Sequence, residues 1–228
     1  MKIGKIISVF ICGITLLYAC GNNDTPIATV AEVQEVAVPT GITFVADTAS
    51  SIIEWRASHR GGITPRWGTL KLKDGSISVN DSTIISGGSF IIDMYTLKVD
   101  SASVIEPGKT HLDLQTHLHS TEFFNSDSFP ESVFEITNVS FYDSTANAGL
   151  LKDATNMVSG NLKLKDSTIN ITFPAKIAIT DSVINVEARF IIDRLKWGLN
   201  YRSQGDPQNW MIDKSIQLGI RLKAIRKE

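Results

Sequence analysis

The chain is poor in cysteine, and its only two cysteines, Cys12 and Cys20, lie near the N-terminus of the 228-residue sequence. From Gly21 to Glu228 there is no thiol, which excludes disulfide bonds and cysteine nucleophiles from that part of the chain. At roughly 190 residues after the leader and linker, the chain is long enough to be stabilised by a hydrophobic core alone.

An excess of charge of one sign is also lacking. The sequence has 22 Lys and Arg against 24 Asp and Glu, a formal net charge of −2, and its basic residues form no patch or stripe. Proteins that bind nucleic acids usually carry such a basic footprint. We therefore expect no nucleic-acid partner.

The N-terminal residues are typical of an export signal. A positively charged start precedes an apolar run, Ile6–Tyr18, which is shorter than the about 20 residues that a membrane-spanning helix needs. The run ends in "LLYAC", which resembles the bacterial lipobox, with Leu17 and Ala19 before Cys20. We expect residues 1–19 to be a lipoprotein signal peptide and Cys20 to be acylated. The alternative is a plain secretory signal with an incidental cysteine.

Acylation would make the membrane a partner through the N-terminal lipid, because more than one acyl chain gives firm anchoring. Gly21 and Asn22 do not resemble an inner-membrane retention signal. The expected location is therefore the outer membrane, on its periplasmic side, with cell-surface display as an alternative. Residues 20–40 contain no aromatic residue, and we interpret them as the lipidated cysteine and a flexible tether. A weaker alternative is that "ATVAEVQEVAV" forms one short strand or helix.

In the rest of the chain, apolar and polar residues alternate. In "SIIEWRAS", Ile53, Trp55 and Ala57 share one face, and "GGSFIIDM", "VINVEARFIID" and "SIQLGIRLKAI" follow the same period of two. Such alternation is typical of antiparallel strands with one buried and one solvated face. Many short strands must close into a barrel or pack as a sandwich. We predict an all-β, antiparallel lipocalin-like β-barrel over residues 41–228, with one short helical segment in the long connection 100–129.

Four stretches carry a family resemblance. "HLHSTEFFNSDSFPESVFEI" has a His-Leu pair, a Phe-Phe pair and a Phe-Pro pair before a strand that begins with an aromatic residue. The residues that fit this motif are His117, Leu118, Phe123, Phe124, Phe129, Pro130 and Phe134. "DTASSIIEWRASH", "VSGNLKLKD" and "FIIDRLKWGLNY" agree with further motifs of the same family. Together, over Ile42 to Ile225, they resemble the YceI-like family.

The resemblance implies a lipocalin-like barrel with an elongated apolar cavity. Family members with known ligands hold a polyisoprenoid, such as an isoprenoid quinone, or another long lipid, so no cofactor other than such a ligand is expected. The candidate lining residues are those on inward strand faces: Trp55, Phe90, Ile92, Met94, Phe134, Ile136, Phe173, Phe190 and Ile192. Arg194, Trp197 and Tyr201 could close one end of the barrel or meet a head group.

The expected function is therefore to bind a long apolar ligand for carriage or sequestration, without chemistry. The main alternative is a structural or interaction protein whose barrel is packed solid. Whether two barrels associate as a homodimer is left open by the sequence.

The histidines raise a second alternative, because His111, His117 and His119 lie close together in the chain. A catalytic zinc site needs three protein ligands, yet in a helix His117 and His119 would point in different directions. The family pattern favours a structural loop that includes His117, Phe123 and Phe124, and we expect a hydrogen bond from His117 to pin it. Without a "GxSxG" elbow or a cysteine nucleophile, we expect no enzymatic activity and no metal site. A His-based metal enzyme is the less favoured alternative.

Overall fold

The computed structural model describes residues 25–59, 64–80, 84–143, 153–202 and 212–227. The predicted signal peptide, residues 1–19, and Cys20 lie outside the described residues. Within the described ranges, the chain forms ten strands, one α-helix and two 3-10 helices. Their bounds are β1 Thr29–Ala31, β2 Ile42–Ala46, β3 Ile52–His59, β4 Arg66–Asn80, β5 Ile84–Val99, η1 Ser101–Ser103, α1 His111–His119, β6 Glu131–Phe141, β7 Asn156–Leu164, β8 Ser167–Ile179, β9 Val183–Asp193, η2 Arg194–Trp197 and β10 Ile212–Arg226.

The strands β3 to β10 form a closed barrel of eight antiparallel strands. Each pairs with the next in sequence order, and β10 pairs with β3 to complete the circle. The short strand β2 lies between β4 and β10 beyond the end of β3. The predicted antiparallel, lipocalin-like barrel is thus confirmed. A barrel of eight strands is wide enough either to be filled by its side chains or to hold one small ligand.

Alternating burial along the strands sets which side chains face the interior. In β5, Phe90, Ile92 and Met94 are buried, and in β9 the same holds for Phe190 and Ile192. Because successive side chains of a strand point to opposite faces, a shift of one residue would turn the whole apolar row toward solvent. The register of the barrel is therefore specified by these rows.

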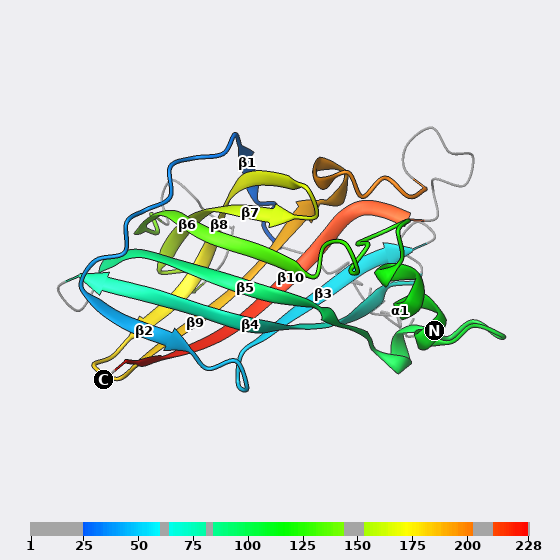
Figure 1. Cartoon of the computed structure of the whole chain (residues 1–228), viewed down its shortest axis with the longest axis horizontal. Helices are drawn as coiled ribbons and strands as arrows, with labels where there is room; N and C mark the ends of the chain where they lie inside the picture. Colours follow the sequence, from blue (N-terminus) through cyan, green and yellow to red (C-terminus); the bar gives the residue numbers. More distant parts are fainter. Residues whose placement is uncertain (1–24, 60–63, 81–83, 144–152, 203–211, 228) are drawn as a thin grey trace, which may run out of the picture.

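The helix α1 lies within the connection 100–129, as predicted, and sits at one end of the barrel (Figure 1). A capping box begins it: the Asp113 backbone N–H donates to Thr110 Oγ1 (3.1 Å), and the Thr110 N–H donates to Asp113 Oδ2 (3.0 Å). The Thr110 hydroxyl also donates to Asp113 Oδ2 (2.7 Å), and this hydrogen bond, together with that from the Thr110 N–H, lowers the pKa of Asp113 below its usual range. In the described part of the chain, no helix is both long and apolar enough to cross a membrane.

Residues 25–40, interpreted from the sequence as part of a flexible tether, belong to the fold instead. The pairing of β8 with β9 covers Ala175–Ile179 of β8 and then ends. Residues 26–31 fill the gap beyond it: the Ala28 N–H donates to the carbonyl of Ile191 in β9 (2.9 Å), and β1 pairs with β8 on its other side. This segment satisfies backbone groups of both strands that would otherwise have no partner in the wall. β1 is the short strand that the weaker sequence alternative described.

We call residues 25–40 the strap. In Figure 1 it is the blue trace that runs from β1 along the outside of the barrel to β2. Gln34 N–H donates to Asn161 Oδ1 on β7 (3.0 Å), and Asn161 Nδ2 donates back to the Gln34 carbonyl (2.7 Å). Farther along, Ala37 N–H donates to the carbonyl of Ile136 on β6 (3.0 Å). The folded body therefore begins before the predicted domain boundary at residue 41.

Candidate functional site

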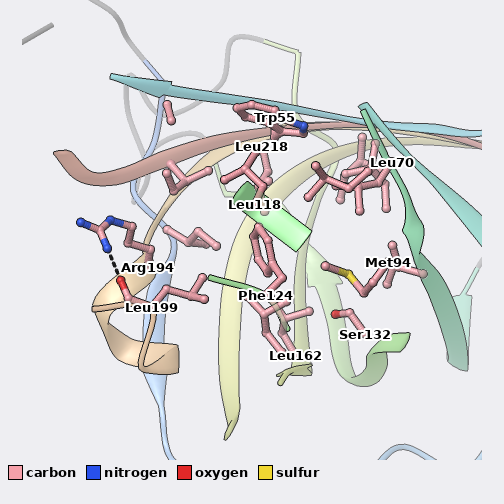
Figure 2. Close-up of a pocket in the computed structure, with 18 of the residues that line it drawn as sticks. Trp55, Leu70, Met94, Leu118, Phe124, Ser132, Leu162, Arg194, Leu199 and Leu218 are labelled. Carbon is pink, nitrogen blue, oxygen red and sulfur yellow. Dashed lines mark hydrogen bonds between the residues drawn. The ribbon is translucent and has the colours of Figure 1, made fainter. Parts of the chain in front are cut away.

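The barrel encloses a cavity of about 980 Å³. Pockets that hold small molecules have volumes of about 300–1,000 Å³, so this one lies at the upper end of that range. Its wall is mostly aliphatic and aromatic, and Figure 2 shows lining side chains from several strands and from the α1 region around the same space. The interior is thus hollow, which argues against the alternative of a solidly packed barrel.

Most of the ligand-binding residues predicted from the sequence lie in this wall. Eleven of the twelve line the cavity: Trp55, Phe90, Ile92, Met94, Phe134, Ile136, Phe173, Phe190, Ile192, Arg194 and Tyr201. They come from β3, β5, β6, β8 and β9 and from the segment around η2. The structure therefore brings together residues that are separated by up to 146 positions in the chain, from 55 to 201.

Part of the reason for the open interior is that aromatic rings lie against the wall, over glycines of neighbouring strands. Phe90 is the cross-strand partner of Gly75, and a Cβ atom added to Gly75 would come within 2.4 Å of the Phe90 ring. On β7, a Cβ at Gly160 would come within 2.3 Å of Phe134. Trp55 lies in the same way against its partner glycine on β4. Because these glycines carry no side chain, the rings can lie along the wall instead of projecting into the cavity.

Two further aromatic rings pack together in the wall near β8 and β9. Phe173 and Phe190 are stacked, with ring centroids 4.0 Å apart and planes 14° apart, and the Phe134 ring centroid lies 5.8 Å from that of Phe173.

Trp197, the twelfth predicted residue, does not line the cavity. It is fully buried, and its Nε1–H donates to the Leu162 carbonyl (3.0 Å). Trp197 therefore joins η2 to β7 and takes no part in lining the cavity.

Polar lining groups gather at the end of the barrel that α1 covers. Arg66 forms an ion pair with Glu106 and also donates to the carbonyl of Ser103 (2.6 Å). Lys109 and Asp113 line the cavity at the same end. Farther into the barrel the lining is apolar, so the cavity combines a polar end with an apolar interior. A molecule with a polar head and a long apolar tail fits this distribution.

The hydrogen bonds that pin the loop after the helix come from His119, whereas the sequence had assigned this role to His117. His119 Nδ1 lies 2.9 Å from Ser126 Oγ, and Nε2 lies 3.2 Å from the carbonyl oxygen of Leu97. His117 lines the cavity instead, and its Nδ1 lies 3.3 Å from a carboxylate oxygen of Glu122. The two rings point in different directions because positions two apart in a helix are about 200° apart.

His117 belongs to an aromatic cluster beside the cavity. Its ring lies edge-on to Tyr201, with centroids 4.7 Å apart, and edge-on to Phe123 at 5.2 Å. Phe124 also lines the cavity, and Figure 2 shows it close to Leu118 of α1. The residues predicted to form a structural loop therefore also form part of the cavity wall.

Arg194 lines the cavity, but it is engaged within the protein. Its side chain is only 2% exposed, and its donors meet backbone carbonyls of Leu199, Asp213 (3.0 Å) and Ile212 (3.4 Å). Figure 2 shows the guanidinium turned toward Leu199 and away from the other lining side chains. Burial lowers the pKa of Arg194. These contacts join η2 to the start of β10, so they favour closure of the barrel end over recognition of a head group.

The described residues provide no set of metal ligands for the alternative of a His-based metal enzyme. Within the described ranges, no group of three or more His, Cys, Asp or Glu side chains is arranged to hold a metal ion. His111 borders a separate hollow on the outer face, whereas His117 and His119 have the partners described above.

Sequence analysis missed the lining residues contributed by α1 and by the segment before it. Leu114 and Leu118 face the cavity from the helix, and Glu106 and Lys109 line it from the preceding loop. The available signal was the spacing of the two leucines, since residues four apart share one face of a helix. The loop residues carried no such signal, because their place depends on how the loop folds over the barrel end.

The sequence also matches a protein-family model. The model for the YceI-like domain matches residues 44–224, most of the chain. This chain belongs to the YceI-like family. No curated protein matches the sequence.

Solved structures that share this fold include the following two. BcnA from Burkholderia cenocepacia aligns with a TM-score of 0.59 at 15% identity, over 78% of this chain and 99% of BcnA. A polyisoprenoid-binding domain from Saccharophagus degradans aligns with a TM-score of 0.50 at 13% identity, over 82% of this chain and 99% of that domain. At these identities the likeness establishes the fold.

Proposed function

We propose that this protein binds a long apolar molecule, such as a polyisoprenoid, an isoprenoid quinone or a fatty lipid, inside the barrel. It would carry or sequester the molecule without changing it chemically. The observation that carries this proposal is the cavity of about 980 Å³, apolar in its interior and polar at the α1 end. The polyisoprenoid-binding domain that shares the fold supports the same class of ligand.

Apolar burial would supply the driving force. Each buried CH₂ group contributes about 0.8 kcal/mol, so a chain of about twenty carbons gains about 16 kcal/mol. Lost translational and rotational freedom costs about 4–15 kcal/mol, and ordering of flexible groups adds to this cost. Tight binding is therefore attainable without many hydrogen bonds, and we expect a negative heat-capacity change on binding.

The same proposal includes an N-terminal lipid on Cys20. Two or more acyl chains would hold the barrel at the outer membrane, on its periplasmic side. A carrier so placed would stay close to the bilayer from which a water-insoluble ligand must come. Acylation can be tested by the mass of the N-terminal peptide and by incorporation of labelled palmitate. A Cys20→Ala variant serves as the control, and an unmodified Cys20 would contradict this part of the proposal.

The ligand is tested by native mass spectrometry and organic extraction of the purified protein. We expect a co-purifying lipid, or uptake of an added C20 isoprenol that quenches or shifts the fluorescence of the cavity residue Trp55. A protein that is free of lipid and takes up neither the isoprenol nor a long-chain fatty acid would refute the binding function.

A further inference from the structure

The strap, residues 25–40, is both a part of the barrel wall and an exposed apolar surface. Within the described chain, twelve large apolar side chains are exposed, and five of these lie on the strap. They are Ile27 (73% exposed), Val30 (47%), Val33 (56%), Val36 (37%) and Val38 (75%). Five exposed large apolar side chains within sixteen residues indicate a contact surface.

The charges of the strap indicate what kind of surface it contacts. It carries Glu32 and Glu35 and has no Lys or Arg. Attraction to anionic lipid or to an acidic protein therefore cannot hold it, and the contact must be made by the apolar side chains. A bilayer surface of neutral lipids fits this chemistry, because interfacial binding grows with the apolar area that is buried in it.

The short distance in sequence between Cys20 and the strap indicates that the partner is the bilayer. Cys20 stands five positions before Thr25, where the strap begins. Five residues span at most about 18 Å even when fully extended. An acyl group on Cys20 would therefore keep the start of the strap within that distance of the lipid.

We propose that the strap is a bilayer-docking surface, which holds the barrel on its side against the membrane that anchors it. This inference rests on the proposed acylation of Cys20 and is independent of which ligand fills the cavity. The strap crosses β7 at Asn161, so the wall around β7 faces the lipid. β3 lies four strands away from β7 in either direction around the barrel and faces water.

The test places a fluorophore at single positions of the full-length, acylated protein. Apart from Cys20, whose thiol is consumed by lipidation, the mature chain has no cysteine. An introduced cysteine is therefore the one free thiol. Val33→Cys labels the strap, and Arg56→Cys labels an exposed position on β3. In phosphatidylcholine vesicles that contain a nitroxide-labelled lipid, we expect quenching several-fold stronger at position 33 than at position 56.

Two further measurements separate the explanations. Adding Ile27→Ser and Val38→Ser to the Val33→Cys protein should abolish the excess quenching. Val45→Ser changes an exposed apolar side chain on β2, which lies between β4 and β10 on the side away from β7, and it should leave the excess intact. The excess should also persist at high salt and weaken when phosphatidylglycerol is added at low salt, because of the two glutamates.

Several results would overturn the proposal. Equal quenching at both labelled positions would show that the barrel does not lie on its strap. Shielding of position 33 that depends on protein concentration and not on vesicles would show that a second copy of the chain covers the strap. The acyl mass on Cys20 is measured first, so that a missing anchor is distinguished from an anchored barrel in another orientation.

Discussion

The contact between Phe90 and Gly75 offers a direct test of why the barrel is hollow. In Gly75→Ala, the new Cβ would lie 2.4 Å from a carbon of the Phe90 ring and 3.1 Å from the carbonyl oxygen of Ser89. Ordinary carbon contacts are about 3.5–4.0 Å, so the ring must move by more than 1 Å. The wall lies behind it, and the cavity is the space into which the ring can turn.

The expected loss of affinity follows from the area of the ring. A buried aromatic side chain covers about 150–250 Å². About half of that area would enter the cavity and displace an equal area of contact between the ligand and the wall. At about 25 cal/mol per Å², the ligand loses roughly 2–3 kcal/mol of apolar contact. This corresponds to an affinity that is roughly 30- to 150-fold weaker. Overpacking should also reduce the free energy of unfolding by about 1–3 kcal/mol.

Binding is measured by titration with a C20 isoprenol, and stability by urea unfolding of the same preparations. Gly219→Ala is the matched control, because its Cβ would meet the Glu54 side chain at 3.3 Å, on the outer face of the barrel. The double variant Gly75→Ala, Phe90→Ala should recover much of the affinity. If Gly75→Ala stays folded and binds as tightly as the wild type, the argument that the glycine keeps the ring out of the cavity is wrong.

Three further predictions concern the barrel end. Arg194→Met should lower the free energy of unfolding, measured in urea, by about 2–4 kcal/mol, because the loss of charge-assisted hydrogen bonds outweighs the removal of a buried charge. Ligand affinity should stay unchanged. A loss of affinity at unchanged stability would indicate that Arg194 contacts the ligand head group instead. His119→Ala should cost about 1–3 kcal/mol in the same assay, and a larger cost for His117→Ala would contradict the assignment of the pinning residue. The lowered pKa of Asp113 means that its stabilisation of α1 is present above about pH 3.9 and is lost as the pH falls through the lower folded-state value. The stability difference between wild type and Asp113→Asn should therefore shrink in acid, and a difference that grows there would exclude this capping role.

The barrel could be predicted from the sequence because its evidence is local. Rows such as Phe90, Ile92 and Met94 alternate with polar residues, and that period is a property of each strand by itself. The helix in the connection 100–129 was likewise indicated by the break in this alternation. Since the interior of a barrel is formed by the inward rows, most of the cavity wall followed from the same pattern.

The strap could not be predicted in the same way, because its structure comes from distant partners. Ala28 is held by the backbone of Ile191, and Gln34 by the side chain of Asn161, and neither contact has a signature within residues 25–40. The hydrogen bonds of His119 were missed, and the role was given to His117, for a similar reason, since the His119 partner Leu97 is 22 residues away. The hollow itself depends on where each aromatic ring turns, which periodicity does not specify.

The position of β1 in the wall also bears on how the protein can be shortened. The family match begins at residue 44, and a recombinant protein trimmed to that boundary would lose the stretch that lies between β8 and β9. Two strand edges would then be bare, and bare edges recruit the edges of other molecules. We expect such a trimmed protein to aggregate or to lose bound ligand. A recombinant protein that keeps the complete barrel wall should therefore start no later than Thr25.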